Sequence, residues 1–308
     1  MGRQAAEIVV HGMLVVVVIA LLVQLPVNRS PTARFGFWLL GLCYATVLPP
    51  LYWLLFPTRA GDGFRDGWAL LSVERWSAMT WHGHALGMVL PELFALVGVA
   101  LFLRDLVPLV WDAATLRLPR PSELPLALLT AAERARLAVG AAMPRLLIQD
   151  TSGVVLVCRG LRRPVIVVST AVVAALEPDE LVAALAHEMC HATRRDPLLG
   201  LLLMIVRGGF IFSPGVQIAA RALVSEMEGR ADERAARGVG DARLVAGSLR
   251  KLADGPAPST SGWERLQRRA IERRCAHLLA PSVACGVPPC SLIATAVGLA
   301  LLLLFTVV

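Results

Sequence analysis

Two histidines and a glutamate stand at a spacing that can build a metal site. His187 and His191 are four residues apart, and Glu188 directly follows the first of them. On a helix, positions i and i+4 share one face, so the two imidazoles can bind a single Zn²⁺ ion. The glutamate can then take a proton from metal-bound water as a general base. Chance alone would produce this HExxH pattern in roughly one chain in 200 of this composition.

Two acidic residues further along the chain can complete such a site. A catalytic zinc site needs a third protein ligand and an open position for water. Glu228 and Asp232 are four residues apart on a predicted helix and share one face. We predict that Glu228 is the third ligand and that Asp232 fixes the tautomer of a zinc-bound imidazole by accepting its hydrogen bond. Glu226 is the rival ligand, but no acidic residue follows it four positions later.

The elements that must position these residues also have sequence signals. Two β-branched runs, 154–158 and 164–168, are separated by a short segment with a glycine and predict a β-hairpin. Pro178, with acidic residues on both sides, predicts the start of a helix that runs to about Arg194. A substrate could add as a strand along 164–168. His277 and Arg230 are the candidates for stabilising the oxyanion.

The composition is that of a membrane protein. Of the 308 residues, 56% are hydrophobic and 17% are charged, whereas soluble domains average about 25% charged residues. Mean hydropathy is +0.65. Four apolar segments approach the roughly 20 residues that cross a bilayer, namely 8–25, 35–56, 86–103 and 291–308. Pro49 and Pro50 are expected to bend or end the second span. A fifth run, 198–212, contains Arg207, which favours an interfacial or half-inserted helix over a full span.

The arginines predict the topology. Most lie between the third and fourth spans, including a cluster at 265–274, and the positive-inside rule places this region in the cytoplasm. The loop 57–80 and both termini are then expected outside. The expected fold is mainly α (α+β), with polytopic membrane helices and a protease domain containing a small β-sheet, the HExxH helix and the ExxxD helix. The expected domains are a membrane region with three spans, the cytoplasmic zinc protease and a final span: 1–112, 113–289 and 290–308.

The net charge of +7 does not indicate nucleic-acid binding. The arginines are spread through the chain rather than gathered with aromatic stacking residues. Lys251 is the only lysine, a bias that we attribute to a bacterial genome rich in G and C. A basic surface lying against anionic lipid fits better. The expected partners are therefore a protein substrate and membrane lipid, with no direct contact to nucleic acid.

The HExxH and ExxxD motifs resemble those of the gluzincin metallopeptidases. More closely, the chain resembles the BlaR/MecR family of membrane antirepressor proteases. The resemblance covers about residues 144–252 and rests on 163–169, 176–181, 187–191, 195–196, 210–214 and 228–232. It implies a multi-pass protein of the cell membrane whose cytoplasmic domain is a metalloendopeptidase with one Zn²⁺ per chain. It also implies a cytoplasmic winged-helix repressor as a candidate substrate.

Two features depart from that family. Its best-known members carry a penicillin-binding sensor after the last span, and this sequence stops at Val308, so sensing of a β-lactam by acylation is not expected. Ser213 stands where a His-Pro pair often occurs. The HtpX family of quality-control membrane proteases, which has the same metal motif, is the near alternative. A catalytically inactive zinc-binding signalling protein is the second alternative.

Overall fold

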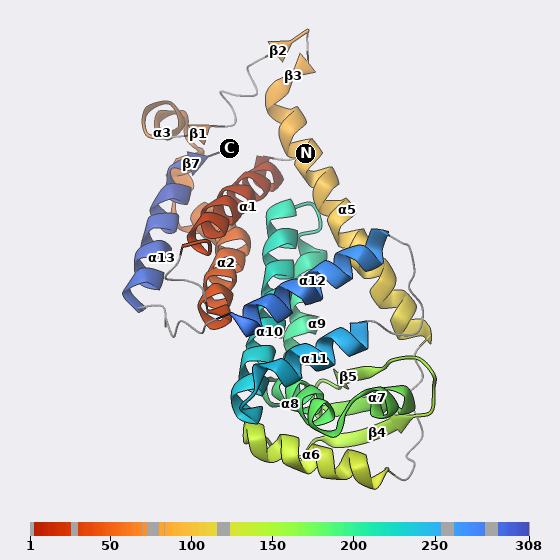
Figure 1. Ribbon diagram of the computed structural model, residues 1–308. Helices are drawn as coiled ribbons and strands as arrows, with labels where there is room; N and C mark the ends of the chain where they lie inside the picture. The colour runs from red at the N-terminus through yellow and green to blue at the C-terminus, as the bar shows by residue number, and fades with distance from the viewer. Residues whose placement is uncertain are drawn as a thin grey trace. The chain divides into compact units, whose positions relative to one another are not determined.

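The described part of the chain is mostly helical and contains a small three-stranded sheet (Figure 1). The computed structural model describes residues 3–25, 30–69, 71–72, 80–82, 84–115, 124–253, 262–280 and 289–307. The chain divides into two compact units. The first contains Met1–Leu116, Leu203–Glu226 and Val283–Val308, and the second contains Arg117–Leu202 and Met227–Ser282.

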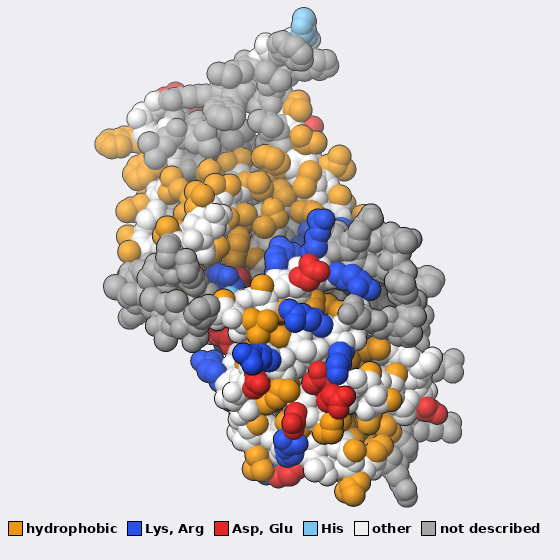
Figure 2. Space-filling model, viewed as in Figure 1, with side chains coloured by type: hydrophobic (Ala, Val, Ile, Leu, Met, Phe, Trp, Pro, Cys, Tyr) orange, Lys and Arg blue, Asp and Glu red, His pale blue; other side chains and the backbone are white. Residues whose placement is uncertain are grey.

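The first unit is built from long apolar helices. These are α1 (Arg3–Leu22), α2 (Pro31–Leu55), α5 (Leu86–Thr115) and α13 (Pro289–Leu304). Between α2 and α5 lie short elements: η2 (Pro57–Ala60), α3 (Asp62–Gly67), β1 (Leu71–Ser72), β2 (Thr80–Trp81) and β3 (His84–Ala85). Strand β2 pairs with β3, whereas β1 pairs in parallel with β7 (Thr306–Val307) beyond α13. Hydrophobic side chains cover much of the drawn face of this unit (Figure 2).

Two of the described helices, α1 and α2, are long and apolar enough to cross a membrane. They coincide with the first two predicted spans. A shorter apolar helix, Ile293–Leu304, lies within α13. The fourth span was predicted to continue to the end of the chain, but the helix stops at Leu304 because the following residues pair with β1 instead. The helix α5 starts where the third span was predicted and extends well beyond it.

Helix α2 continues through Pro49 and Pro50, so of the two expected effects these prolines do not end the helix, and a bend at them stays a prediction. A proline removes one N–H donor and crowds the carbonyl of the preceding turn, and transmembrane helices tolerate it where neighbouring groups satisfy the freed carbonyl. Other contacts hold this region of the helix. The Tyr44 and Tyr52 hydroxyls donate to the carbonyls of Ala296 and Ala300 on α13, at 2.7 and 2.6 Å.

Buried and partly buried ion pairs pack the middle of the chain against α5 in the first unit. Arg207 of α9 (Asp196–Gly209) donates to Asp105 of α5 at 2.6 Å and to Gln217 of α10 (Pro214–Val239) at 2.8 Å. Arg221 of α10 donates to the same aspartate. The expected domain boundaries assigned residues 203–226 to the protease domain, whereas these contacts pack them with α5 in the first unit. Whether α9 lies in the membrane interface stays a prediction.

The second unit combines helices with the three-stranded sheet. Its elements are α6 (Leu126–Val139), β4 (Arg145–Gln149), β5 (Leu156–Arg159), β6 (Val165–Ser169), α7 (Thr170–Ala175), α8 (Pro178–Arg194), α11 (Ala242–Ala253) and α12 (Gly262–Leu279). The sheet order is β4-β6-β5, with β4 parallel and β5 antiparallel to β6. The register pairs Leu156 with Val168, which confirms the predicted hairpin. Helix α8 contacts α6, α11, β5 and β6.

The sheet order corrects one expectation about substrate binding. Because β6 is paired on both sides, its backbone cannot accept an added strand along 164–168. Strand β4, which the sequence analysis did not predict, occupies the edge of β6 that a substrate would have used. Among the described residues, β4 and β5 each pair only with β6, so each has an unpaired edge that could take an added strand. Of the two, β5 is the strand that contacts the HExxH helix α8.

Candidate metal centre

Helix α8 carries the HExxH motif and begins where the sequence predicts. A capping box forms at its start, where the Glu180 side chain accepts the backbone N–H of Glu177 at 3.0 Å. The helix ends at Arg194, and Arg195 adopts a left-handed conformation with φ of 55°. Every residue from Leu181 to His191 is buried. The motif is therefore held inside the second unit by a helix that is packed on all sides.

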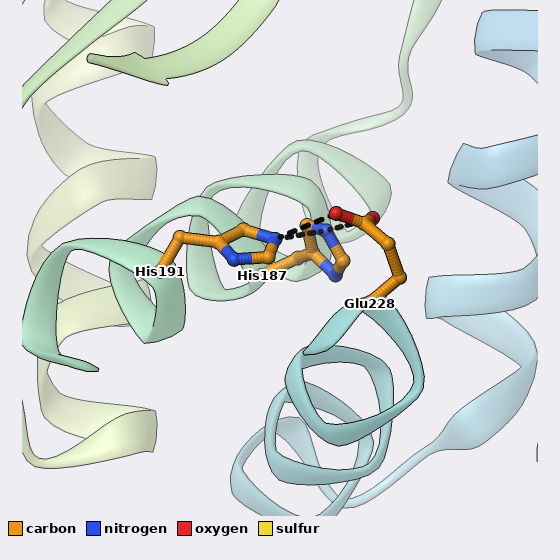
Figure 3. Close-up of side chains that lie close together, drawn as sticks. All are labelled: His187, His191 and Glu228. Carbon is orange, nitrogen blue, oxygen red and sulfur yellow. Dashed lines mark hydrogen bonds and ion pairs between the residues drawn. The ribbon is translucent and has the colours of Figure 1, made fainter. Parts of the chain in front are cut away.

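The two histidine rings and Glu228 converge on one point (Figure 3). Nε2 of His187 lies 3.0 Å from Nε2 of His191. From α10, the Glu228 carboxylate places Oε2 at 3.5 Å from Nε2 of His187 and Oε1 at 3.6 Å from Nε2 of His191. One ligand atom from each residue lies within 4.8 Å of the others. The structure thus brings together the three predicted ligands.

Each imidazole is held from behind by an aspartate. Oδ1 of Asp232 lies 2.8 Å from Nδ1 of His187, at an angle outside that of an ideal hydrogen bond, so this contact is chiefly electrostatic. Oδ2 of Asp196 lies 2.6 Å from Nδ1 of His191. Contacts of this kind fix the ring orientation and leave Nε2 free for a metal. The sequence predicted Asp232 but missed Asp196, whose only signal is its place just after the end of the HExxH helix.

Both aspartates are paired with arginines, which keep them anionic. Burial alone would raise the pKa of Asp232, but hydrogen bonds from Arg274 and the contact with His187 hold that pKa below its ordinary value. Burial likewise opposes ionisation of Asp196, and contacts with His191 and Arg194 lower its pKa. Each of the two histidines therefore contacts an aspartate, and each aspartate in turn contacts an arginine.

The ligand side chains are themselves strongly coupled. Burial alone would lower the pKa of His187, but Asp232 and Glu228 raise it to about 10. Burial would raise the pKa of Glu228, whereas His187, Arg274 and His191 hold that pKa well below its ordinary value. Without a metal, this pair is therefore a protonated imidazole facing a carboxylate.

Glu188 is buried beside the ligands and next to the sheet. Burial raises the pKa of its carboxyl group, and the positive charge of His187 and His191 opposes that shift. A backbone hydrogen bond with Cys158 of β5 stabilises the carboxylate. Burial and the nearby Glu188 charge raise the pKa of the Cys158 thiol to about 12. Glu188 thus contacts β5, an edge strand of the sheet, from the same helix that carries the two histidines.

The donor set fits a zinc ion. Two imidazole nitrogens and one carboxylate oxygen are the ligands of many catalytic zinc sites, which also keep one position for water. The charges agree as well. Glu188, Asp196, Glu228 and Asp232 supply four carboxylates against two guanidinium groups, so a dication with neutral histidines would make the cluster electrically neutral.

Three other candidates lie elsewhere among the described residues. Glu226, the rival ligand, is 3.0 Å from the Arg34 guanidinium and is not part of the histidine–glutamate cluster. Nε2 of His277 lies 3.4 Å from the Glu233 carboxylate. Burial and the charge of Arg194 lower the pKa of Arg230. Neither His277 nor Arg230 belongs to the cluster, and their assignment as oxyanion stabilisers stays a prediction.

Comparison with known protein families agrees with this geometry. Residues 153–245 match the model of the BlaR1 peptidase M56 family. This part of the chain is similar to the BlaR/MecR-type peptidases. The match contains β5, β6, α8 and all three residues of the histidine–glutamate cluster. The family and the two apolar N-terminal helices together indicate a membrane-associated metallopeptidase. The HtpX-type alternative has no such support, and no curated protein shows significant similarity to the chain.

Proposed function

We propose that the chain is a zinc-dependent membrane endopeptidase that hydrolyses peptide bonds in protein substrates. One observation carries this proposal: the Nε2 atoms of His187 and His191 face each other at 3.0 Å beside the Glu228 carboxylate. The glutamate of the HExxH motif is buried next to them. A purely structural metal site would not need that additional base, which argues against an inactive signalling protein.

The chain's own residues divide the work of hydrolysis. When bound, Zn²⁺ supplies an acidified water and polarises the scissile carbonyl. Glu188 accepts the proton of that water and then passes it to the leaving amine. Its raised pKa suits both steps, because a proton acceptor that must later donate works best with a pKa near the working pH. Asp232 and Asp196 keep the two imidazoles oriented throughout.

The open edge of β5 offers a place for an extended substrate. An added strand would use backbone hydrogen bonds, which recognise many sequences equally well. The backbone of Cys158 in this strand is hydrogen-bonded to the Glu188 carboxylate, so a peptide along β5 would pass close to the general base. We therefore propose that the substrate strand pairs with the edge of β5 rather than with residues 164–168.

The family match also supports a regulatory role. We infer that the protease domain faces the cytoplasm, as its arginines predict, and that it cleaves a soluble repressor of the winged-helix class. Cleavage of misfolded membrane proteins in the manner of HtpX is the alternative substrate class. Identification of proteins that accumulate in cells expressing Glu188→Gln instead of the wild type distinguishes the two.

A protease assay tests the proposed activity. The full chain is purified in detergent with Zn²⁺, and casein cleavage is measured for the wild type, Glu188→Gln and Glu133→Gln. Loss of a general base costs on the order of 10²- to 10⁴-fold in rate, so Glu188→Gln should be nearly inactive. Glu133 is exposed on α6 and serves as the matched control. Equal cleavage by the wild type and Glu188→Gln, or none by the wild type, contradicts the proposal.

A further inference from the structure

One guanidinium group on α12 contacts two carboxylates of the metal centre at once. Nε of Arg274 donates to Oδ2 of Asp232 at 2.7 Å, and Nη2 donates to Oδ1 of the same carboxylate at 2.7 Å. Nη1 of Arg274 lies 3.0 Å from Oε2 of Glu228. Arg274 thus makes a bidentate hydrogen bond to Asp232, and its remaining guanidinium nitrogen contacts the proposed ligand Glu228. It lies outside residues 153–245, so the family match does not assign it a role.

The surroundings of Arg274 distinguish it from its neighbours on α12. Arg269 and Arg273 are exposed, and Nε of Arg273 contacts only the carbonyl of Arg269 among the described interactions. The Arg274 side chain is 21% exposed and rests on Asp232, which is 2% exposed. The next residue, Cys275, is fully buried, with its thiol 3.6 Å from the carbonyl of Ala246 on α11. That buried face of α12 holds the guanidinium in place.

We propose that Arg274 is a positioning residue of the metal centre, holding the ligand Glu228 and the ring-orienting Asp232 in the geometry that captures the ion. The inference rests on the proposed zinc site. The bidentate hydrogen bond keeps Asp232 against Nδ1 of His187, and the third nitrogen keeps Glu228 turned toward the two Nε2 atoms. A guanidinium group is well suited to holding two carboxylates because its donors lie in one plane at fixed positions.

Arg274 could affect metal affinity in two opposite ways, so the sign of the change on its removal tests the proposed role. The guanidinium is a positive charge beside a site for a dication, so charge repulsion alone would weaken metal binding. If that effect dominated, removal of the side chain would tighten binding. If positioning dominates, removal frees Glu228 and Asp232 and weakens binding. Loss of an outer partner of a metal ligand typically costs 10- to 100-fold in affinity.

The arginine on the other side of the site provides an internal comparison. Arg194 contacts Asp196, which holds His191, and its Nη2 donates to the carbonyl of Met227 at 3.1 Å. No contact described for Arg194 reaches Glu228. Removal of Arg194 should therefore disturb only one ring orienter, and its effect on metal affinity should be smaller than that of removing Arg274.

The test measures Zn²⁺ affinity rather than proteolysis. Full-length protein in detergent competes with a fluorescent zinc chelator, and the wild type is compared with Arg274→Ala, Arg274→Lys, Arg194→Ala and Arg273→Ala. We expect Arg274→Ala to bind Zn²⁺ about 10- to 100-fold more weakly. Arg274→Lys should also be weakened, because one ammonium cannot reproduce the bidentate hydrogen bond and the third contact. The exposed control Arg273→Ala should match the wild type.

Thermal unfolding of the metal-free proteins separates positioning from misfolding. A folded Arg274→Ala that binds Zn²⁺ as tightly as the wild type, or more tightly, overturns the inference. Should Arg274→Ala fail to fold, a folded Arg274→Lys with wild-type affinity overturns it equally. A wild-type protein that binds no Zn²⁺ refutes the proposed function instead. Tight wild-type binding with unaffected Arg274 variants refutes only the role of this arginine.

Discussion

At the scale of single residues, His187 and Glu228 show how the centre is prepared for a cation. In the metal-free protein the two side chains form a charged pair, with the pKa of His187 raised to about 10 and that of Glu228 held low. A metal can bind only to the neutral imidazole. The bound ion therefore replaces the imidazole proton as the positive charge that faces Glu228 and is supported by Asp232.

This replacement predicts that Zn²⁺ binding releases protons. Between pH 7 and 9 the metal-free His187 is protonated, and the metal-bound ring is neutral, so at least one proton leaves per ion. The affinity should accordingly rise about tenfold per pH unit until the pH approaches the pKa of His187. Isothermal titration in buffers with different ionisation enthalpies measures the release. Binding heats that do not depend on the buffer would contradict this description of the pair.

The residues of the site that could be predicted are those whose positions follow from spacing within one helix. The ligands follow from spacing: His187 and His191 lie one turn apart, and Glu228 lies one turn before Asp232. Asp196, Arg194 and Arg274 could not be predicted, because their roles depend on how the helices pack. Arg274 is 42 residues from Asp232 along the chain, and nothing in its own segment separates it from the other arginines of α12.

At the scale of elements, α8 is the part on which the ligands depend. Its first turn is closed by the Glu180 side chain, which accepts the Glu177 backbone N–H and also lies 2.6 Å from Nζ of Lys251 on α11. The same side chain thus caps the helix and ties it to its neighbour. Leu185, which lies between this cap and His187, is fully buried.

We expect Glu180→Ala to destabilise the protein by about 1 kcal/mol, the usual cost of a lost helix cap. Chemical denaturation of the full chain in detergent measures the free energy of unfolding. Glu133→Ala is the control, because its exposed ion pair with Arg136 on α6 should contribute little. Zn²⁺ binding by folded Glu180→Ala should persist, since the cap lies two turns from His187. Equal stabilities for the two variants would show that the cap does not stabilise α8.

The hairpin and α8 were predictable because their signals are local. Residues 165–169 are β-branched apart from Ser169, and Pro178 marks a helix start. The position of β6 between two strands was not predictable, because β4 pairs directly with β6 although β5 lies between them in the sequence. The second span was predicted at 35–56, but the residues alone could not decide whether Pro49 and Pro50 end the helix. Packing against α13 outweighs the local preference to break the helix.

At the scale of the whole molecule, the two units differ in the chemistry of their surfaces. The drawn face of the first unit is largely apolar, whereas Lys, Arg, Asp and Glu side chains are gathered on that of the second (Figure 2). The first unit contains both helices that are long and apolar enough to span a membrane. The second contains all three residues of the histidine–glutamate cluster. This division agrees with the proposed membrane endopeptidase.

Reporter insertions test the proposed topology. The positive-inside rule predicts that the arginine-rich second unit is cytoplasmic and that the loop 57–80 is external. Alkaline phosphatase, which is active only outside the cytoplasm, should therefore be active when inserted after Asp66 and inactive when inserted at 254–261. A fluorescent protein that folds only in the cytoplasm should give the reverse pattern. Phosphatase activity at 254–261 would place the metal centre on the opposite side of the membrane.

The metal content of the purified protein tests the central claim most directly. Elemental analysis is applied to the wild type, His187→Ala and Glu188→Gln, each confirmed to be folded. If His187, His191 and Glu228 hold the ion and Glu188 acts only as a base, the wild type and Glu188→Gln should contain one zinc per chain and His187→Ala should contain little. A wild-type protein without stoichiometric zinc, or full zinc in His187→Ala, would contradict the account.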